Sequence, residues 1–60
     1  MKITRINKQT YTVEMKGETF DILQRSFSDY WCVKSDKLDI THLCDTLSEC
    51  FDYIEYIMLI

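Results

Sequence analysis

Residues 10–23, TYTVEMKGETFDIL, decide the fold class. In residues 10–15 every second residue is apolar, and the residues between them are threonine or glutamate. A period of two is typical of a strand that lays one face on a core and turns the other to water. Gly17, the only glycine of the chain, can take the positive φ that a tight hairpin needs, and the alternation resumes in residues 19–23. The stretch therefore predicts an antiparallel hairpin around residues 16–17.

Segments of similar character lie on either side of this hairpin. KITRI, residues 2–6, precedes it and is followed by Asn7 and Lys8 as turn residues, whereas DYWCVKS, residues 29–35, comes after it. Tyr, Trp, Cys and Val all suit a pleated, half-buried surface. We therefore expect three or four short strands joined by tight turns, with neighbours along the chain paired as a meander.

The hydrophobic period changes in the second half of the chain. From Leu47 onward the apolar residues are spaced i, i+3, i+4, i+7, i+10 and i+11, which is one stripe of an α-helix. The residues of this stripe are Leu47, Cys50, Phe51, Ile54, Ile57 and Met58. The period predicts an amphipathic carboxy-terminal helix.

The start of this helix has two interpretations. Thr46 followed three residues later by Glu49 is a capping-box pattern, which favours a start near Thr46. Alternatively Asp39 is the cap, with Leu38 and Leu43 as the hydrophobic staple around it. The segment LDITHLC is therefore left open between strand, turn and first helical turns.

One amphipathic helix laid across one antiparallel sheet is the simplest way to bury both apolar faces, which predicts a two-layer α+β fold. At 60 residues the chain forms at most a single domain, residues 1–60, and such a domain buries only about 60% of its unfolded surface. No volume is left for a deep substrate pocket. A hydrophobic content of 47% and the absence of proline indicate a compact folded unit.

The sequence also carries information about the compartment. The first ten residues have no apolar run behind their positive charge, and no stretch approaches the ~20 apolar residues that span a bilayer. We therefore expect a cytoplasmic protein with no membrane contact. The cysteines, Cys32, Cys44 and Cys50, are then expected to be reduced thiols.

The segment SFSDYWCVKS concentrates aromatic side chains. Phe27, Tyr30 and Trp31 lie within five positions of one another. On a strand Tyr30 and Trp31 point to opposite faces, and a single helix covers only one of them. In one interpretation Trp31 packs under the helix and Tyr30 sits half-exposed. In the other, Trp31 or Tyr30 anchors a protein contact together with Phe27, because Trp and Tyr dominate interface hot spots.

Acidic residues gather on the expected helix. Residues 1–25 carry a net charge of +2 and residues 26–60 a net charge of −5, which gives −3 for the chain. The acidic helix face consists of Asp45, Glu49, Asp52 and Glu55. Such a row either keeps the helix soluble or steers it toward a basic surface.

The carboxy-terminal residues YIEYIMLI have more apolar side chains than one short helix can bury. Leu59 points away from the line through Ile54 and Met58, and exposed apolar patches usually mark contacts. The helix end therefore suggests a homodimer or a docked partner, the alternative being that the last residues wrap over the sheet edge.

No catalytic, cofactor or metal signature is present in the sequence. His42, Cys44, Cys50 and Cys32 can be written as a ligand set, but they include no C-x-x-C pair and Cys50 falls on the helix core stripe. The chain also lacks phosphate loops and nucleophile elbows. We expect no enzymatic activity, no cofactor and no metal.

Nucleic-acid binding is the alternative function. The spacing of Trp31 and Val33 on a strand and of Thr46, Glu49 and Cys50 at a helix start resembles the amino-terminal domains of some phage-type integrases, which have a three-stranded sheet and a helix. That resemblance implies a DNA-binding sheet, although Cys50 stands where the family has alanine. The basic residues available for phosphates are Lys2, Arg5, Lys8, Lys16 and Arg25.

A non-enzymatic protein-interaction module is the function that these features favour. In composition the chain is similar to the small accessory proteins of phages and mobile elements that inhibit or redirect a host factor. The expected contacts are Phe27, Tyr30 and Trp31 as anchors and the acidic helix face as the steering surface.

Overall fold

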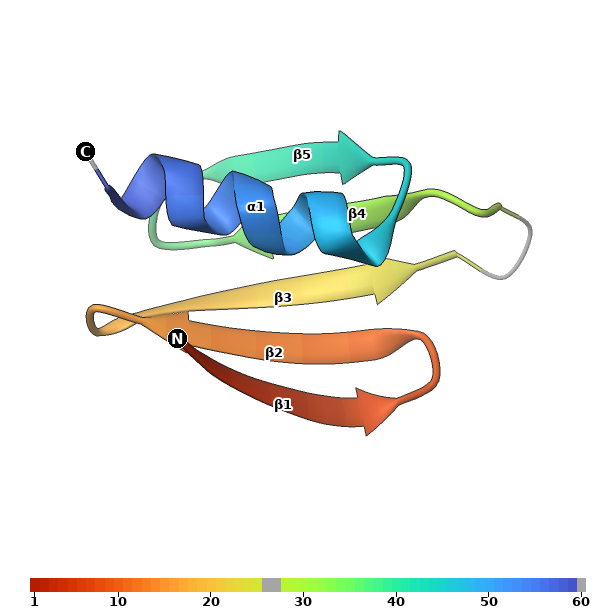
Figure 1. Ribbon diagram of the computed structural model, residues 1–60, viewed down its shortest axis with the longest axis horizontal. Coiled ribbons are helices and arrows are strands. Elements are labelled where there is room, and N and C mark those ends of the chain that lie inside the picture. The colour runs from red at the N-terminus through yellow and green to blue at the C-terminus, as the bar shows by residue number, and fades with distance from the viewer. Residues whose placement is uncertain (26–27, 60) are drawn as a thin grey trace.

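The computed structural model of the protein describes residues 1–25 and 28–59, which form one antiparallel sheet and one helix (Figure 1). The strands are β1 (Lys2–Asn7), β2 (Thr10–Met15), β3 (Glu18–Gln24), β4 (Trp31–Ser35) and β5 (Ile40–Cys44). The helix is α1 (Leu47–Met58). The α+β class and the carboxy-terminal helix are therefore confirmed.

The sheet is a meander with the spatial order β1-β2-β3-β4-β5, and each strand is antiparallel to its neighbours. The expected count of three or four strands is too low, because Ile40–Cys44 forms a fifth strand at the edge of the sheet. Asp39 does not cap a helix. It lies in the turn before β5 with φ 54°, and its N–H donates to the Asp36 carbonyl at 3.3 Å.

The hairpin predicted from residues 10–23 forms at the expected place. Lys16 and Gly17 occupy its turn with φ of 53° and 80°, both left-handed, as in the type I′ turn that matches the twist of paired strands. Val13 stands opposite Phe20 in the β2–β3 register, and directly opposite residues share a face of the sheet. The apolar residues of both strands therefore meet on one face.

The helix begins after Thr46, as the first of the two interpretations predicted. The Thr46 Oγ1 accepts a hydrogen bond from the Glu49 N–H at 3.2 Å, and the Glu49 carboxylate accepts one from the Asp45 N–H at 3.1 Å. These bonds satisfy backbone donors that have no partner inside the helix. At the other end, the Lys16 ammonium donates to the Met58 carbonyl at 2.7 Å, which ties the helix to the β2–β3 turn.

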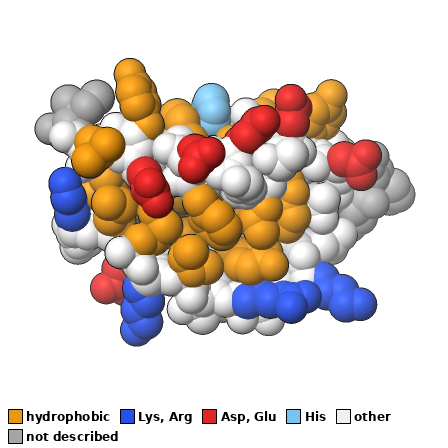
Figure 2. All heavy atoms as spheres, in the orientation of Figure 1, with side chains coloured by type: hydrophobic (Ala, Val, Ile, Leu, Met, Phe, Trp, Pro, Cys, Tyr) orange, Lys and Arg blue, Asp and Glu red, His pale blue; other side chains and the backbone are white. Residues whose placement is uncertain are grey.

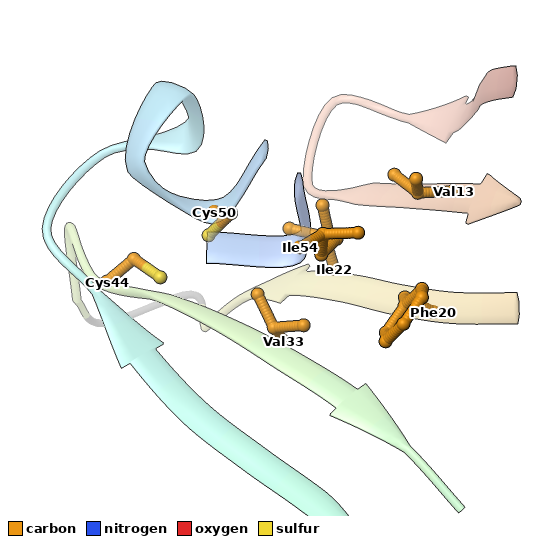
Figure 3. Close-up of a cluster of buried hydrophobic side chains, with 7 residues drawn as sticks. All are labelled: Val13, Phe20, Ile22, Val33, Cys44, Cys50 and Ile54. Carbon is orange, nitrogen blue, oxygen red and sulfur yellow. The ribbon is translucent and has the colours of Figure 1, made fainter. Parts of the chain in front are cut away.

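The core lies between α1 and the face of the sheet that it covers (Figure 3). Its buried apolar residues are Val13, Phe20, Ile22, Val33, Cys44, Cys50 and Ile54. Tyr11 extends this core by meeting Phe51 of the helix edge to face, with ring centroids 6.4 Å apart. At the β5 side His42 stacks on Tyr53 at 3.8 Å. Aromatic contacts therefore flank the aliphatic centre on both sides.

The helix does not cover the sheet evenly. It lies over and contacts mainly β4 and β5 (Figure 1). Every residue of β1, in contrast, is exposed. The helix-facing side of β1 and part of that of β2 are therefore left to solvent. In the described part of the chain no helix has the length and apolar character needed to cross a membrane.

Candidate protein-binding surfaces

The two neighbouring rings at the start of β4 point in different directions. Trp31 stands opposite Gln24 and Cys44 in the register and packs against the core on the helix side. Tyr30 precedes the strand, is 57% exposed, and is held by a hydrogen bond from its N–H to the Ser28 hydroxyl at 3.0 Å. The structure thus supports the interpretation with Trp31 under the helix. Phe27, the third predicted anchor, lies outside the described residues.

Tyr30 borders a pocket of about 210 Å³, which we call the open-face pocket. Its lining residues are Arg25, Ser28, Tyr30, Cys32 and Leu43. Cys32 stands opposite Leu23 of β3 and Leu43 of β5. Because side chains alternate along a strand, these three residues point away from the face that carries the core residues Ile22 and Val33. The pocket is therefore on the sheet face turned away from the helix.

The size and chemistry of the open-face pocket suit one side chain of a partner. Its volume lies below the ~300–1,000 Å³ of typical small-molecule sites. Cys32 is 6% exposed and forms its floor, whereas Leu43, 65% exposed, and Tyr30 form an apolar rim. Arg25 supplies the cation at this rim. An apolar side chain next to a carboxylate would satisfy both features.

The acidic helix face is fully displayed but lies away from Tyr30. Asp45, Glu49, Asp52 and Glu55 are all exposed, and we call them the acidic ridge (Figure 2). Because α1 lies on the face of the sheet opposite the open-face pocket, one flat partner surface cannot touch both. Glu49 is also engaged in the helix cap. The structure does not bring the predicted anchors and the predicted steering face together.

The basic residues of the first half are similarly dispersed. Lys2 stands opposite Glu14 and Arg5 opposite Tyr11, so their side chains project from opposite faces of the sheet. Lys16 is engaged with the helix end, and Arg25 borders the open-face pocket. With Lys8 in the β1–β2 turn, the predicted phosphate-binding set does not share one face.

The cysteines and the histidine have structural surroundings. Cys44 and Cys50 are buried on the helix side, Cys32 is buried on the other face, and all three are unpaired thiols. Burial raises the pKa of Cys50, and the adjacent Cys44 thiol adds to the rise. Burial likewise raises the pKa of Cys44. Among residues 1–25 and 28–59, no cluster of His, Cys, Asp and Glu could hold a metal ion.

A second apolar surface lies beside the helix. It consists of Ile3, Tyr11, Met15, Phe51 and Met58, which we call the helix-side strip. Ile3 is 47% exposed on the uncovered side of β1, and the other four are half-buried against the core. Figure 2 shows apolar side chains between the acidic ridge and the basic side chains along the β1 edge.

Sequence reasoning did not identify Cys32 and Leu43 as site residues, and it assigned Arg25 only to the alternative phosphate-binding set. Leu43 was missed because its segment was left open between strand and helix. The available signal was the alternation of Ile40, His42 and Cys44, which turns Leu43 to the opposite face once β5 is recognised.

Comparisons of the chain with protein-family models, with curated proteins and with solved structures find no match. Its function is therefore inferred from the geometry and chemistry of its surfaces.

Proposed function

We propose that this protein is a non-enzymatic interaction module that binds one apolar side chain of a protein partner in the open-face pocket. The observation that carries the proposal is the position of Tyr30, a 57% exposed ring beside a pocket of about 210 Å³ on the uncovered face of the sheet. A large exposed aromatic next to a pocket is a typical interface anchor. The module acts by occupying a surface on its partner.

Rigid surroundings favour this role for the pocket. Cys32 is paired with β3 on one side and with β5 on the other, and further pairs follow it in both directions along each ladder, so the pocket floor is part of the sheet. Tyr30 has few rotatable bonds, and its backbone is fixed by the Ser28 hydroxyl. Little conformational entropy is therefore lost when a partner binds.

Arg25 indicates the chemistry of the partner segment. Arg25 lines the pocket together with Tyr30 and Leu43, and a carboxylate of the partner can accept charge-assisted hydrogen bonds from its guanidinium. We infer that the module prefers segments in which a large apolar residue neighbours Asp or Glu. Inhibition or redirection of a cytoplasmic host factor is the biological role consistent with such a small binding domain.

A peptide library displayed on phage tests the proposal. Wild type should enrich peptides with an apolar residue beside an acidic one, and Tyr30→Ala should weaken the binding of those peptides by at least about 10-fold. Tyr56→Ala is the matched control, because Tyr56 is equally exposed, at 64%, but lies on α1. It should bind the selected peptides as wild type does.

Three results would overturn the proposal. The first is that no peptide is selected by the folded wild type. The second is that the selected peptides bind Tyr30→Ala as tightly as wild type. The third is that they move amide resonances of α1 instead of those of Cys32 and Leu43 in a ¹⁵N spectrum.

A further inference from the structure

We propose that the helix-side strip is the interface of a two-fold homodimer, in which the helix of each copy lies over the uncovered parts of β1 and β2 of the other. The proposed occupant of the strip is thus a second copy of this chain. The strip is separate from the open-face pocket, which lies on the other face of the sheet.

The strip is apolar, and no element formed by residues 1–25 and 28–59 covers it fully. Ile3 stands opposite Val13 and so projects from the helix side of β1, but α1 contacts β4 and β5 and leaves Ile3 47% exposed. Met58, at the carboxy-terminal end of α1, is only half-buried. A partly exposed apolar strip of this kind gains stability when a complementary surface excludes water.

Charges are ordered across this face in a self-complementary way. The acidic ridge runs along α1, the helix-side strip lies beside it, and the basic edge follows β1 and its turn (Figure 2). This edge is formed by Arg5, which stands opposite Tyr11 and so lies on the helix side of β1, and by Lys8 in the turn. When a second copy is turned over by 180° about an axis parallel to the strands, its ridge meets the basic edge of the first copy. The same contact occurs twice because the dimer is symmetric.

The other two-fold arrangements oppose like charges. Pairing the β1 edges of two copies in one continuous sheet brings both sets of Lys2, Arg5 and Lys8 together. Turning the second copy about an axis across the strands places ridge on ridge. Like charges placed opposite each other at an interface are unfavourable, so charge selects the axis parallel to the strands.

The face has the dimensions that a dimer requires. The protein measures 32 × 20 × 19 Å, and Figure 1 views it down the shortest axis. Small, weak interfaces bury up to about 600 Å² per partner, and a face of 32 × 20 Å is large enough for an interface of that size. A dimer formed in this way leaves both open-face pockets facing outward, so each dimer can bind two partner segments. A partner that carries two such segments would therefore be bound with higher avidity than by a monomer.

Sedimentation velocity across a dilution series tests the dimer directly. Wild type should pass from monomer to dimer as its concentration rises, and Ile3→Ser, a change on an exposed edge strand, should weaken the dimer at least about 10-fold. A wild type that remains monomeric up to about 1 mM would overturn the proposal.

Charge reversal tests the arrangement. The acidic variant is Arg5→Glu with Lys8→Glu, and the basic variant is Asp52→Lys with Glu55→Lys. Each should self-associate at least about 10-fold more weakly than wild type, because both symmetric contacts become repulsive. An equimolar mixture should restore a dimer, since every contact is again between opposite charges.

A control variant separates this arrangement from simple attraction of net charges. Glu14→Lys with Asp21→Lys changes the net charge from −3 to +1, as the basic variant does, but on the open face. Circular dichroism verifies that each variant is folded. The proposed geometry would be excluded if the acidic and basic variants did not associate with each other. It would also be excluded if the acidic variant bound this control as tightly as it binds the basic variant. Both outcomes are independent of the peptides that the open-face pocket binds.

Discussion

Tyr11 and Trp31 meet edge to face, with ring centroids 5.8 Å apart and an interplanar angle of 60°. The contact joins β2 to β4 across β3, and Phe51 of α1 meets Tyr11 from above. Edge-to-face pairs add about 0.5–1.5 kcal/mol to the benefit of burial. This aromatic group therefore helps to hold the helix on the sheet.

Trp31→Ala should destabilise the fold strongly. Loss of a large packed ring costs about 3–5 kcal/mol, a large part of the stability of a domain of 60 residues. Urea denaturation followed by far-UV circular dichroism measures the loss, since the variant lacks the tryptophan fluorophore. Tyr56→Ala, on the exposed side of the helix, should change stability by no more than about 0.5 kcal/mol. Equal small effects of both changes would contradict a structural role for Trp31.

Gly17→Ala should lower the free energy of unfolding by about 1 kcal/mol or slightly more. A Cβ at this position meets nothing within 4 Å, so the cost arises from the backbone φ of 80° and not from a clash. Gly17→Asn should cost less, because Asn tolerates the left-handed region better than Ala. Thermal or urea unfolding of the two variants compares these costs, and an Asn variant that is less stable than the Ala variant would contradict a conformational origin.

Thr46→Ala should destabilise the protein by about 1 kcal/mol through loss of the helix cap. The Thr46 hydroxyl accepts the Glu49 N–H at 3.2 Å, and this donor has no substitute partner inside the helix. Thr46→Ser keeps the hydroxyl and should stay within a few tenths of a kcal/mol of wild type. Urea denaturation measures both, and equal losses would show that the methyl group, not the hydrogen bond, is responsible.

The sequence was informative where the hydrophobic period was regular. The hairpin at Gly17 and the cap at Thr46 could both be predicted because the signals are local. Strand β5 could not be predicted, because the apolar Leu43 interrupts its alternation and Asp39 is a residue type that also caps helices. The conformation of this segment is decided by its pairing with β4. The open-face pocket depends on that pairing, because only β5 brings Leu43 next to Cys32.

The buried thiols predict that stability falls at alkaline pH. Burial raises the pKa of Cys50 and of Cys44 above the ordinary value of 9.0 in the folded protein. The unfolded chain therefore releases these protons as the pH rises through about 9, while the folded chain retains them, so the unfolded state is favoured. The Cys50 thiol should lower the free energy of unfolding by up to about 1.4 kcal/mol per pH unit above that point, and Cys44 acts in the same direction.

Urea denaturation between pH 8 and about pH 10.5 measures this slope, with Cys50→Ala as the comparison. The variant is expected to be less stable near neutrality because the core loses a packed sulfur, but its stability should fall less steeply with pH. All other groups are common to both proteins, so their contribution cancels in the difference between the two slopes. Parallel slopes for wild type and Cys50→Ala would mean that the Cys50 thiol titrates alike in the folded and unfolded chain, which its complete burial argues against.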